Sequence, residues 1–353
     1  MTTSHPSVNI DVCENRIDGI SPAVLRILLQ DHSKSTSKKY ESIFWATDNY
    51  KKWGPDYAYG KPITPELITG KHGKIIQPRV VKSKEVQMAR SKGMAEVFTP
   101  SWVCNFQNNQ IDSVWFGNGN VFNREIEKED GTHSWIVSSD KIRFPAGKDW
   151  THYVNDIRLE ISCGEAPYIV SRYDTTTGEF IPVENRIGIL DRKLRVVGEN
   201  VETPQEWLKW AEAAYKATYA YEWQGDSLLL AREAAFMTLF DYYEAKFGKN
   251  GASQKEECAL PTEIIEHFAE IISWNFWQMD GQKGVVPNSC DTEKELTLDL
   301  FGEVSEERMR CEGCARDDFK RHNGVYCKIM DWQFVNPRTK KMGKVVRFVD
   351  TLR

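Results

Sequence analysis

The sequence predicts an α/β fold built around a largely parallel sheet. From about residue 151, short runs of β-branched and aromatic residues alternate with longer segments of helical periodicity. Such alternation is typical of parallel strands joined by crossover helices. With 353 residues, 41% of them hydrophobic, the chain is long enough to bury one large core or two ordinary ones.

The first part of the chain, residues 1–92, is expected to form an N-terminal α+β region. A helical pattern covers 22–30, a buried strand is predicted at 43–47, and a basic helix is predicted at 83–97. A further helix begins at Ser101, and the Gly- and Asn-rich stretch that follows it indicates a hairpin.

An α/β domain is expected over 93–285, followed by a Cys-rich segment over 286–353. Thr203 and Glu206 have the spacing of a capping box and fix the start of one helix of this domain. The elements predicted here are strands at 159–162, 186–190, 219–222, 275–280 and 325–331 and helices at 203–215, 228–247 and 264–272.

Composition argues against a membrane-spanning or secreted, disulfide-rich protein. No apolar run is long enough to span a bilayer, the N-terminus lacks signal-peptide features, and eight cysteines are too few for a disulfide scaffold. We therefore expect a cytoplasmic protein. Because the net charge is −5, any DNA-binding surface must be local. The candidates, which a solvated helix face would explain almost equally well, are Lys74, Arg79, Lys82, Lys84, Arg90 and Lys92.

Acidic residues stand at or near the ends of three of the predicted strands. Glu160 is followed by the turn Cys163-Gly164, whose glycine lets the backbone approach a ligand closely. Glu222 ends the next strand, where a carboxylate can accept both hydroxyls of a ribose, and Asp280 ends the third. The pattern predicts a nucleotide-sized ligand at the carboxyl edge of the sheet, although capped helices without a ligand would share it.

The order of these acids after Phe98-Thr-Pro resembles the amino-directed DNA methyltransferases of restriction–modification systems. The phrases at 95–103, 159–168, 190–197 and 271–275 are similar to short proteins usually labelled as methylase subunits of such systems. The resemblance covers roughly 80–285 and implies a Rossmann-like sheet that binds S-adenosylmethionine. The cofactor contacts that it implies are Phe98, Thr99, Pro100, Glu160, Cys163, Gly164, Glu222 and Asp280.

The sequence departs from this family at two points of the site. Glu165 stands where the family has a small residue, so its carboxylate would face that of the cofactor unless it turns away. The family's Asp/Asn-Pro-Pro-aromatic motif, which holds a flipped adenine, is absent because the chain contains no Pro-Pro. The nearest catalytic substitute is Asp331-Trp332, although a buried tryptophan beside a surface aspartate explains this pair better. A cytosine-ring mechanism lacks its Pro-Cys nucleophile.

The C-terminal cysteines have the spacing of a metal site. Cys311 and Cys314 flank a glycine as in a zinc knuckle, and Cys327 with His322 or Cys290 could complete a tetrahedral shell. A closed shell of four protein ligands would hold a structural Zn²⁺. The alternative is a loop with free thiols.

Three functions are compatible with these patterns. The first is an S-adenosylmethionine-dependent DNA adenine methyltransferase, or methylase subunit, of a restriction–modification or phage defence system. The second is a catalytically degenerate subunit that binds cofactor or DNA beside a restriction or specificity subunit. The third is a metal-dependent nuclease, in which Asp191 and Lys193 follow the predicted strand at 186–190 and Glu184 or Asp174 supplies a second acid.

Overall fold

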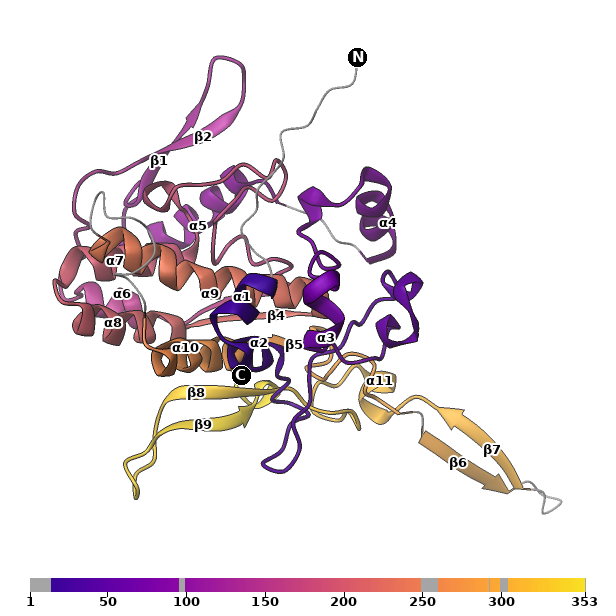
Figure 1. Cartoon of the computed structure of the whole chain (residues 1–353). Coiled ribbons are helices and arrows are strands. Elements are labelled where there is room, and N and C mark those ends of the chain that lie inside the picture. Colours follow the sequence, from indigo (N-terminus) through magenta and orange to yellow (C-terminus); the bar gives the residue numbers. More distant parts are fainter. Residues whose placement is uncertain (1–13, 95–98, 249–259, 292, 299–303, 353) are drawn as a thin grey trace, which may run out of the picture.

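A three-stranded parallel sheet lies at the centre of the fold (Figure 1). In the computed structural model, which describes residues 14–94, 99–248, 260–291, 293–298 and 304–352, the strand order is β3-β4-β5. The register pairs Leu159 with Tyr219 and Tyr221 with Trp277. Because the strands are parallel, their carboxyl ends meet at one edge of the sheet. The strands are β3 (Arg158–Glu160), β4 (Thr218–Glu222) and β5 (Phe276–Gln278).

Helices cover one face of this sheet. Figure 1 shows α9 above the strands, and both α9 and α10 contact β4 and β5. Ala220 and Phe276 share the main hydrophobic core with these two helices, whereas the residues that alternate with them belong to a second core. Thr203 caps α8 by accepting a hydrogen bond from the Glu206 N–H at 3.3 Å, which confirms the predicted helix start. The helices of this region are α6 (Trp150–Asn155), α7 (Ile189–Asn200), α8 (Pro204–Lys216), α9 (Gly225–Phe247) and α10 (Thr262–Asn275).

The N-terminal segment packs into the same hydrophobic core as the sheet. Leu25 and Leu28 of α2 are fully buried, and α2 lies against α10. The predicted strand at 43–47 is buried but forms only an isolated bridge between Phe44 and Pro62. The helices of this segment and the next are α1 (Glu14–Ile20), α2 (Pro22–Leu29), α3 (Pro65–Ile68), α4 (Lys84–Met94) and α5 (Ser101–Phe116), with 3-10 turns at Lys51–Trp53, Pro55–Tyr57, Gly70–His72 and Arg79–Val81.

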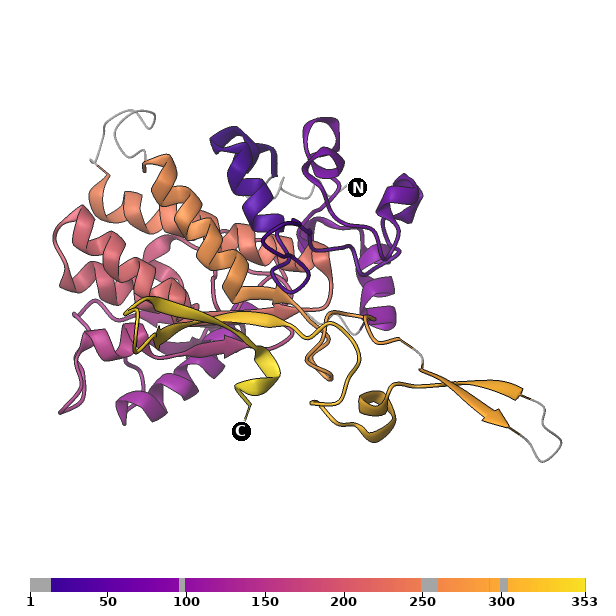
Figure 2. The same ribbon diagram turned by 90° about the horizontal axis from the view of Figure 1, so that it is seen from below.

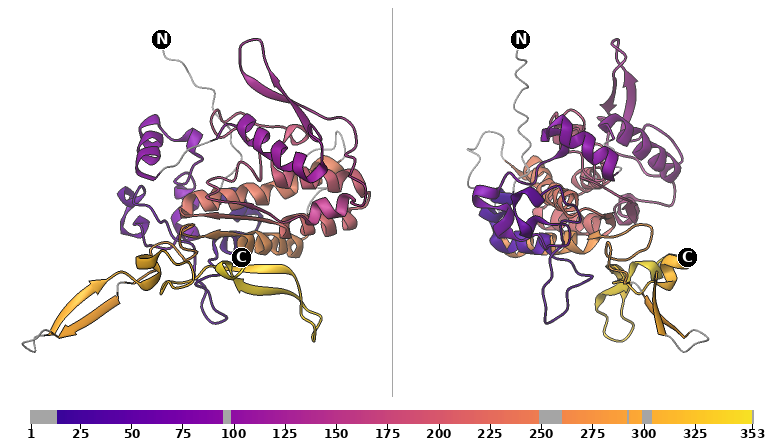
Figure 3. Two further views of the ribbon diagram at one scale, coloured as in Figure 1. Left: turned by 180° about the vertical axis from the view of Figure 1, so that it is seen from behind. Right: turned by 90° about the vertical axis from the view of Figure 1, so that its right-hand side faces the viewer.

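Antiparallel hairpins complete the architecture. The β8–β9 hairpin crosses beneath the central sheet in Figure 2, and Ile329 of β8 shares a second core with Tyr219 and Trp277. Figure 3 shows the β1–β2 and β6–β7 hairpins projecting away from the body. The remaining elements are β1 (Asn123–Glu127), β2 (His133–Val137), β6 (Glu293–Leu298), β7 (Val304–Met309), β8 (Lys328–Val335), β9 (Met342–Arg347), α11 (Glu312–Arg316) and 3-10 turns at Val183–Asn185 and Phe348–Asp350.

The described part of the chain is thus a mixed α/β fold with small sheets. Its other sheets each have two strands, so the larger methyltransferase sheet that the resemblance implies is not confirmed. The strand predicted at 186–190 is wrong, because α7 begins at Ile189 and the Asp191 side chain accepts the N–H of Gly188 at 3.2 Å. Among the described helices, none is long and apolar enough to cross a membrane.

Candidate functional site

A cavity of about 950 Å³ opens at the carboxyl ends of β3 and β4. This volume lies in the range of small-molecule and cofactor sites. Most of the lining comes from three distant segments: Thr99 with α5, the loop 160–167 after β3, and 222–227 after β4. Single residues of other segments complete it: Ala46, Tyr59, Ile189 and Asn288. The structure therefore brings together the predicted contacts Thr99, Glu160, Cys163, Gly164 and Glu222.

The loop after β3 has an unusual backbone. Ser162, Gly164 and Ala166 have φ values of 48°, 55° and 58°, and such left-handed conformations are unfavourable for the two residues that carry a Cβ. The Cys163 N–H donates to Tyr221 O at 2.9 Å and so ties the loop to β4. Strained loops of this kind concentrate at functional sites.

Glu222 organises the floor of the cavity. Its Oε2 accepts the N–H of Gly164 at 2.8 Å, and its Oε1 accepts the N–H of Gln224 at 3.1 Å. Burial raises the pKa of this carboxyl, and the bond from Gly164 opposes the rise. Because each carboxylate oxygen has two acceptor positions, Glu222 can still accept hydrogen bonds from a ligand.

Two buried acceptors in the cavity wall lack a partner among the described residues. Glu160 is 9% exposed and Asn108 1% exposed; their Oε2 and Oδ1 atoms make no hydrogen bond there. Burial raises the pKa of Glu160 well above its ordinary value. A buried acceptor without a partner costs about 1–3 kcal/mol, so hydrogen-bond donors of a ligand would be stabilised here.

The charge of the cavity wall selects among ligand classes. Glu160, Glu165 and Glu222 contribute to the lining, whereas no Lys, Arg or His of the described residues does. Glu165 is turned into its own network, where it accepts the Arg79 N–H at 2.7 Å and the Tyr173 hydroxyl at 2.5 Å. The wall therefore suits a ligand without phosphates.

Among the described residues, the predicted cofactor contacts Pro100 and Asp280 do not line the cavity. Phe98 lies outside the described residues, and Pro100 is the N-cap of α5. The Asp280 carboxylate stays within its own turn, accepting the Gln282 N–H at 3.0 Å and pairing with Lys283 at 3.2 Å. Sequence patterns missed Asn108, although a polar residue on the buried side of a helix just after Phe-Thr-Pro is a usable signal.

The predicted catalytic pair lies at the opposite end of the sheet. The Trp332 indole N–H donates to Asn275 Oδ1 at 2.7 Å, and Asn275 precedes β5 and donates to Thr218 O at the start of β4. Asp331 Oδ1 accepts the N–H groups of Gln333 and Phe334 within the β8 bulge. The structure thus separates Asp331 and Trp332 from the cavity and does not support the acceptor site that was predicted from them.

Part of the predicted DNA-binding segment is also corrected. Arg90 is 1% exposed, and its Nη1 lies 2.9 Å from Asp226 Oδ2. Lys82 approaches the same carboxylate at 3.5 Å, and Arg79 Nη2 donates to Ser91 Oγ at 2.7 Å. Lys82 and Arg90 therefore pair with the buried Asp226 carboxylate and are not available to bind DNA. The candidates that remain exposed are Lys74, Lys84 and Lys92.

The structure buries the two residues on which the nuclease interpretation rests, Asp191 and Lys193. Asp191 is fully buried and accepts the N–H and hydroxyl of Ser171 at 2.8 and 3.0 Å. The Lys193 ammonium donates to Asp156 O and Ala217 O at 2.6 and 2.9 Å. These two residues are fixed on buried faces of α7, with no access for a phosphodiester.

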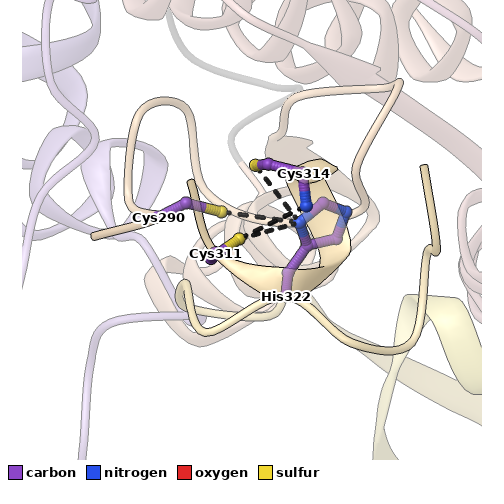
Figure 4. Close-up of side chains that lie close together, drawn as sticks. All are labelled: Cys290, Cys311, Cys314 and His322. Atoms are coloured by element: carbon purple, nitrogen blue, oxygen red, sulfur yellow. Dashed lines mark hydrogen bonds between the residues drawn. The ribbon is translucent and has the colours of Figure 1, made fainter. Parts of the chain in front are cut away.

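Four C-terminal side chains form a candidate metal centre, defined here as Cys290, Cys311, Cys314 and His322. Their ligand atoms all lie within 4.8 Å of one another, and His322 Nδ1 is 3.6 Å from each sulfur. Figure 4 shows the three thiols pointing toward this nitrogen. Tetrahedral Zn²⁺ with its ordinary bond lengths separates S and N by about 3.6 Å, so the cluster could bind such an ion.

Local backbone features build this centre. Cys311 is the N-cap of α11, and its Sγ accepts the Cys314 N–H at 3.4 Å. Gly313 leaves room for the imidazole, since a Cβ there would lie 2.7 Å from His322 Nδ1. Burial raises the pKa of Cys311, but the backbone N–H groups of Asn323 and Cys314 and the side chains of His322 and Cys314 together lower the pKa to about 6.

Cys327 is not part of the metal centre. It is fully buried in the core beneath the sheet, where its Sγ donates to Gln278 O at 3.3 Å. The sequence interpretation that placed Cys327 among the ligands is wrong, and Cys290 and His322 both take part. Spacing alone left this choice open because two residues competed for the fourth position.

No family model, curated protein or solved structure matches this chain.

Proposed function

We propose that the cavity binds S-adenosylmethionine and that the chain is a methylase subunit acting on adenine in DNA, within a restriction–modification or phage defence system. One observation carries this proposal. Five of the eight contacts that the resemblance implies come from three separate segments and line one cavity: Thr99, Glu160, Cys163, Gly164 and Glu222.

The charge of the wall supports this cofactor over other nucleotides. S-adenosylmethionine carries a sulfonium and an ammonium group but no phosphate. Glu222 would accept the ribose hydroxyls, while the free oxygens of Glu160 and Asn108 would accept the ammonium protons. The phosphates of ATP or NAD would instead face carboxylates with no basic residue of the described wall to neutralise them. The bound cofactor would supply an activated methyl group.

A degenerate subunit is the second candidate function. It is favoured by the position of Asp331 and Trp332, which lie at the amino ends of the strands while the cavity lies at the carboxyl ends. In this case the chain would bind the cofactor for a restriction or specificity subunit that supplies the adenine-binding residues.

Calorimetry of the purified protein tests the cofactor. We expect S-adenosylmethionine to bind near one equivalent and ATP and NAD to give no binding heat. Binding of ATP or NAD in place of S-adenosylmethionine would overturn the proposal. Sequencing DNA from cells that express the protein alone, with modified adenine as the readout, then separates the active enzyme from the degenerate subunit.

We also propose that the metal centre holds one Zn²⁺. Three sulfurs and one imidazole nitrogen are a donor set that Zn²⁺ prefers. Because four protein ligands leave no open position, the ion would stabilise the fold and would not activate water.

A further inference from the structure

The metal centre and the cavity share one loop. Asn288 stands two residues before the metal-centre residue Cys290 and lines the cavity. Its Nδ2 donates to the hydroxyl of Tyr59 at 2.9 Å, and Tyr59 also lines the cavity. We call Tyr59 and Asn288 the cavity rim.

The loop between Asn288 and Cys290 has little freedom of its own. Asn288 has a left-handed φ of 54°, and Ser289 Oγ accepts the Val325 N–H at 3.0 Å. Gly324 allows this close approach, because a Cβ there would lie 3.0 Å from Cys290 Sγ and 2.7 Å from Ser289 Oγ. A displacement of Cys290 would therefore move Asn288 as well.

The other side of the rim is anchored in the N-terminal segment. The Tyr59 carbonyl accepts the Ala46 N–H at 2.8 Å, and the Tyr59 N–H donates to Asp48 Oδ1 at 3.0 Å. Ala46 itself lines the cavity. The bond from Asn288 to Tyr59 thus connects the metal-binding segment to a wall that is far away in sequence.

A metal ion would tie Cys290 to the cysteines that follow β7. The four donor atoms lie within 4.8 Å of one another, an arrangement that a shared cation would stabilise. Loss of the ion would remove the link between Cys290 and the two cysteines that follow β7, Cys311 and Cys314.

We propose that Zn²⁺ or a similar cation in the metal centre fixes the position of the cavity rim, Asn288 and Tyr59. Removal of the metal would therefore weaken ligand binding in the cavity, although the ion does not touch the ligand. Asn288 and Tyr59 are positioning residues in this scheme. The identity of the ligand rests on the proposed function, whereas the coupling of rim to metal does not.

The test compares zinc-loaded protein, chelator-treated protein and protein reloaded with Zn²⁺. We expect S-adenosylmethionine affinity to fall about threefold to tenfold on metal removal, the range of one neutral hydrogen bond, and to return on reloading. Asn288→Ala should lower the affinity by a similar factor while the protein keeps its zinc. Chelation of this variant should then lower the affinity little further, because both changes break the same connection between the metal centre and Tyr59. Asn120→Ala, another exposed asparagine with a left-handed φ of 59°, is the matched control and should leave affinity unchanged.

Hydrogen exchange separates this inference from the cofactor assignment. With no ligand added, metal removal should speed exchange at 284–291 and at 57–61 but not in the β1–β2 hairpin. If S-adenosylmethionine never binds but this exchange pattern is seen, the proposed function fails and the coupling stands. Equal exchange at 57–61 with and without zinc, or equal affinity in both forms, overturns the coupling.

Discussion

Arg90 and Asp226 form an ion pair that is closed to solvent on both sides. Their Nη1 and Oδ2 atoms are 2.9 Å apart, and the side chains are 1% and 0% exposed. The Tyr50 hydroxyl donates to the same carboxylate at 2.7 Å. Since Arg90 also donates to Gln224 and Ser227 in the cavity wall, the pair fastens α4 to the site.

Replacing this carboxylate should be strongly destabilising. Asp226→Asn leaves Arg90 buried without a counter-charge, and we expect the free energy of unfolding to fall by about 3–5 kcal/mol. Urea denaturation at pH 7 measures this fall in the free energy of unfolding. The exposed Asp140→Asn is the control, with a change expected within about 0.5 kcal/mol.

The same pair gives the stability a defined pH dependence. Burial raises the pKa of Asp226, but Arg90 and Lys82 lower it to well below its ordinary value of 3.8. A lowered folded-state pKa contributes stability above 3.8 that is lost as the pH falls further. The difference in the free energy of unfolding between wild type and Asp226→Asn should therefore become smaller below pH 3.8. A difference that does not change with pH would contradict the ion pair.

Glu222→Ala should weaken S-adenosylmethionine binding by about 1.5–3 kcal/mol, the scale of hydrogen bonds to a charged group. The change removes the acceptors for the ligand and for the Gly164 and Gln224 N–H groups. Calorimetry gives the affinity, with the exposed Glu184→Ala as control. Unchanged affinity would remove Glu222 from the binding site.

Substitution of single cysteines should show which of them bind the metal. Protein purified without added zinc should contain about one equivalent by elemental analysis, and Cys311→Ser and Cys314→Ser should lose it. Cys327→Ser is the matched control and should keep the metal, because its sulfur bonds Gln278 O in the core. Loss of zinc from Cys327→Ser would show that the ligand set is misassigned.

DNA binding, if the proposed function holds, should depend on the exposed lysines. Reversing Lys74, Lys84 and Lys92 to Glu should flatten the salt dependence of duplex binding by about 0.9 in log–log slope for each phosphate that the protein no longer neutralises. Filter binding at several salt concentrations measures the slope. The control reverses three exposed lysines elsewhere, Lys128, Lys141 and Lys340; an equal effect would mean that the surface is not local.

Asp331→Ala should affect stability and leave cofactor binding intact. The change removes two hydrogen bonds of 3.1 Å in the β8 bulge and should cost about 1–3 kcal/mol. Thermal melting and calorimetry with S-adenosylmethionine check the two effects separately. A variant that melts like wild type but no longer transfers methyl groups would restore Asp331 to the active site.

Local sequence patterns predicted the part of the site that follows directly from the pairing of neighbouring strands. Glu160 and Glu222 end adjacent parallel strands, so their meeting at one edge follows from topology that the strand–helix alternation already indicates. Asp280 follows the same rule, but its turn captures its carboxylate through Lys283. Local pattern contains no information about such competing partners.

Other assignments failed because the deciding partner is distant in sequence. Arg90 in a basic helix has the local character of a solvated residue, and only the fold brings Asp226 to it. Cys327 has the spacing of a zinc ligand, yet the β8 strand directs it beneath the sheet to Gln278. Long-range packing, which spacing does not encode, decided both cases.

The position of Cys290 and Cys311 on either side of the β6–β7 hairpin has an engineering consequence. Both ends of this arm meet at the metal centre, so its root is closed whatever the length of chain between them. A reporter module or an exchanged arm placed there would be carried on a base that the metal centre fixes.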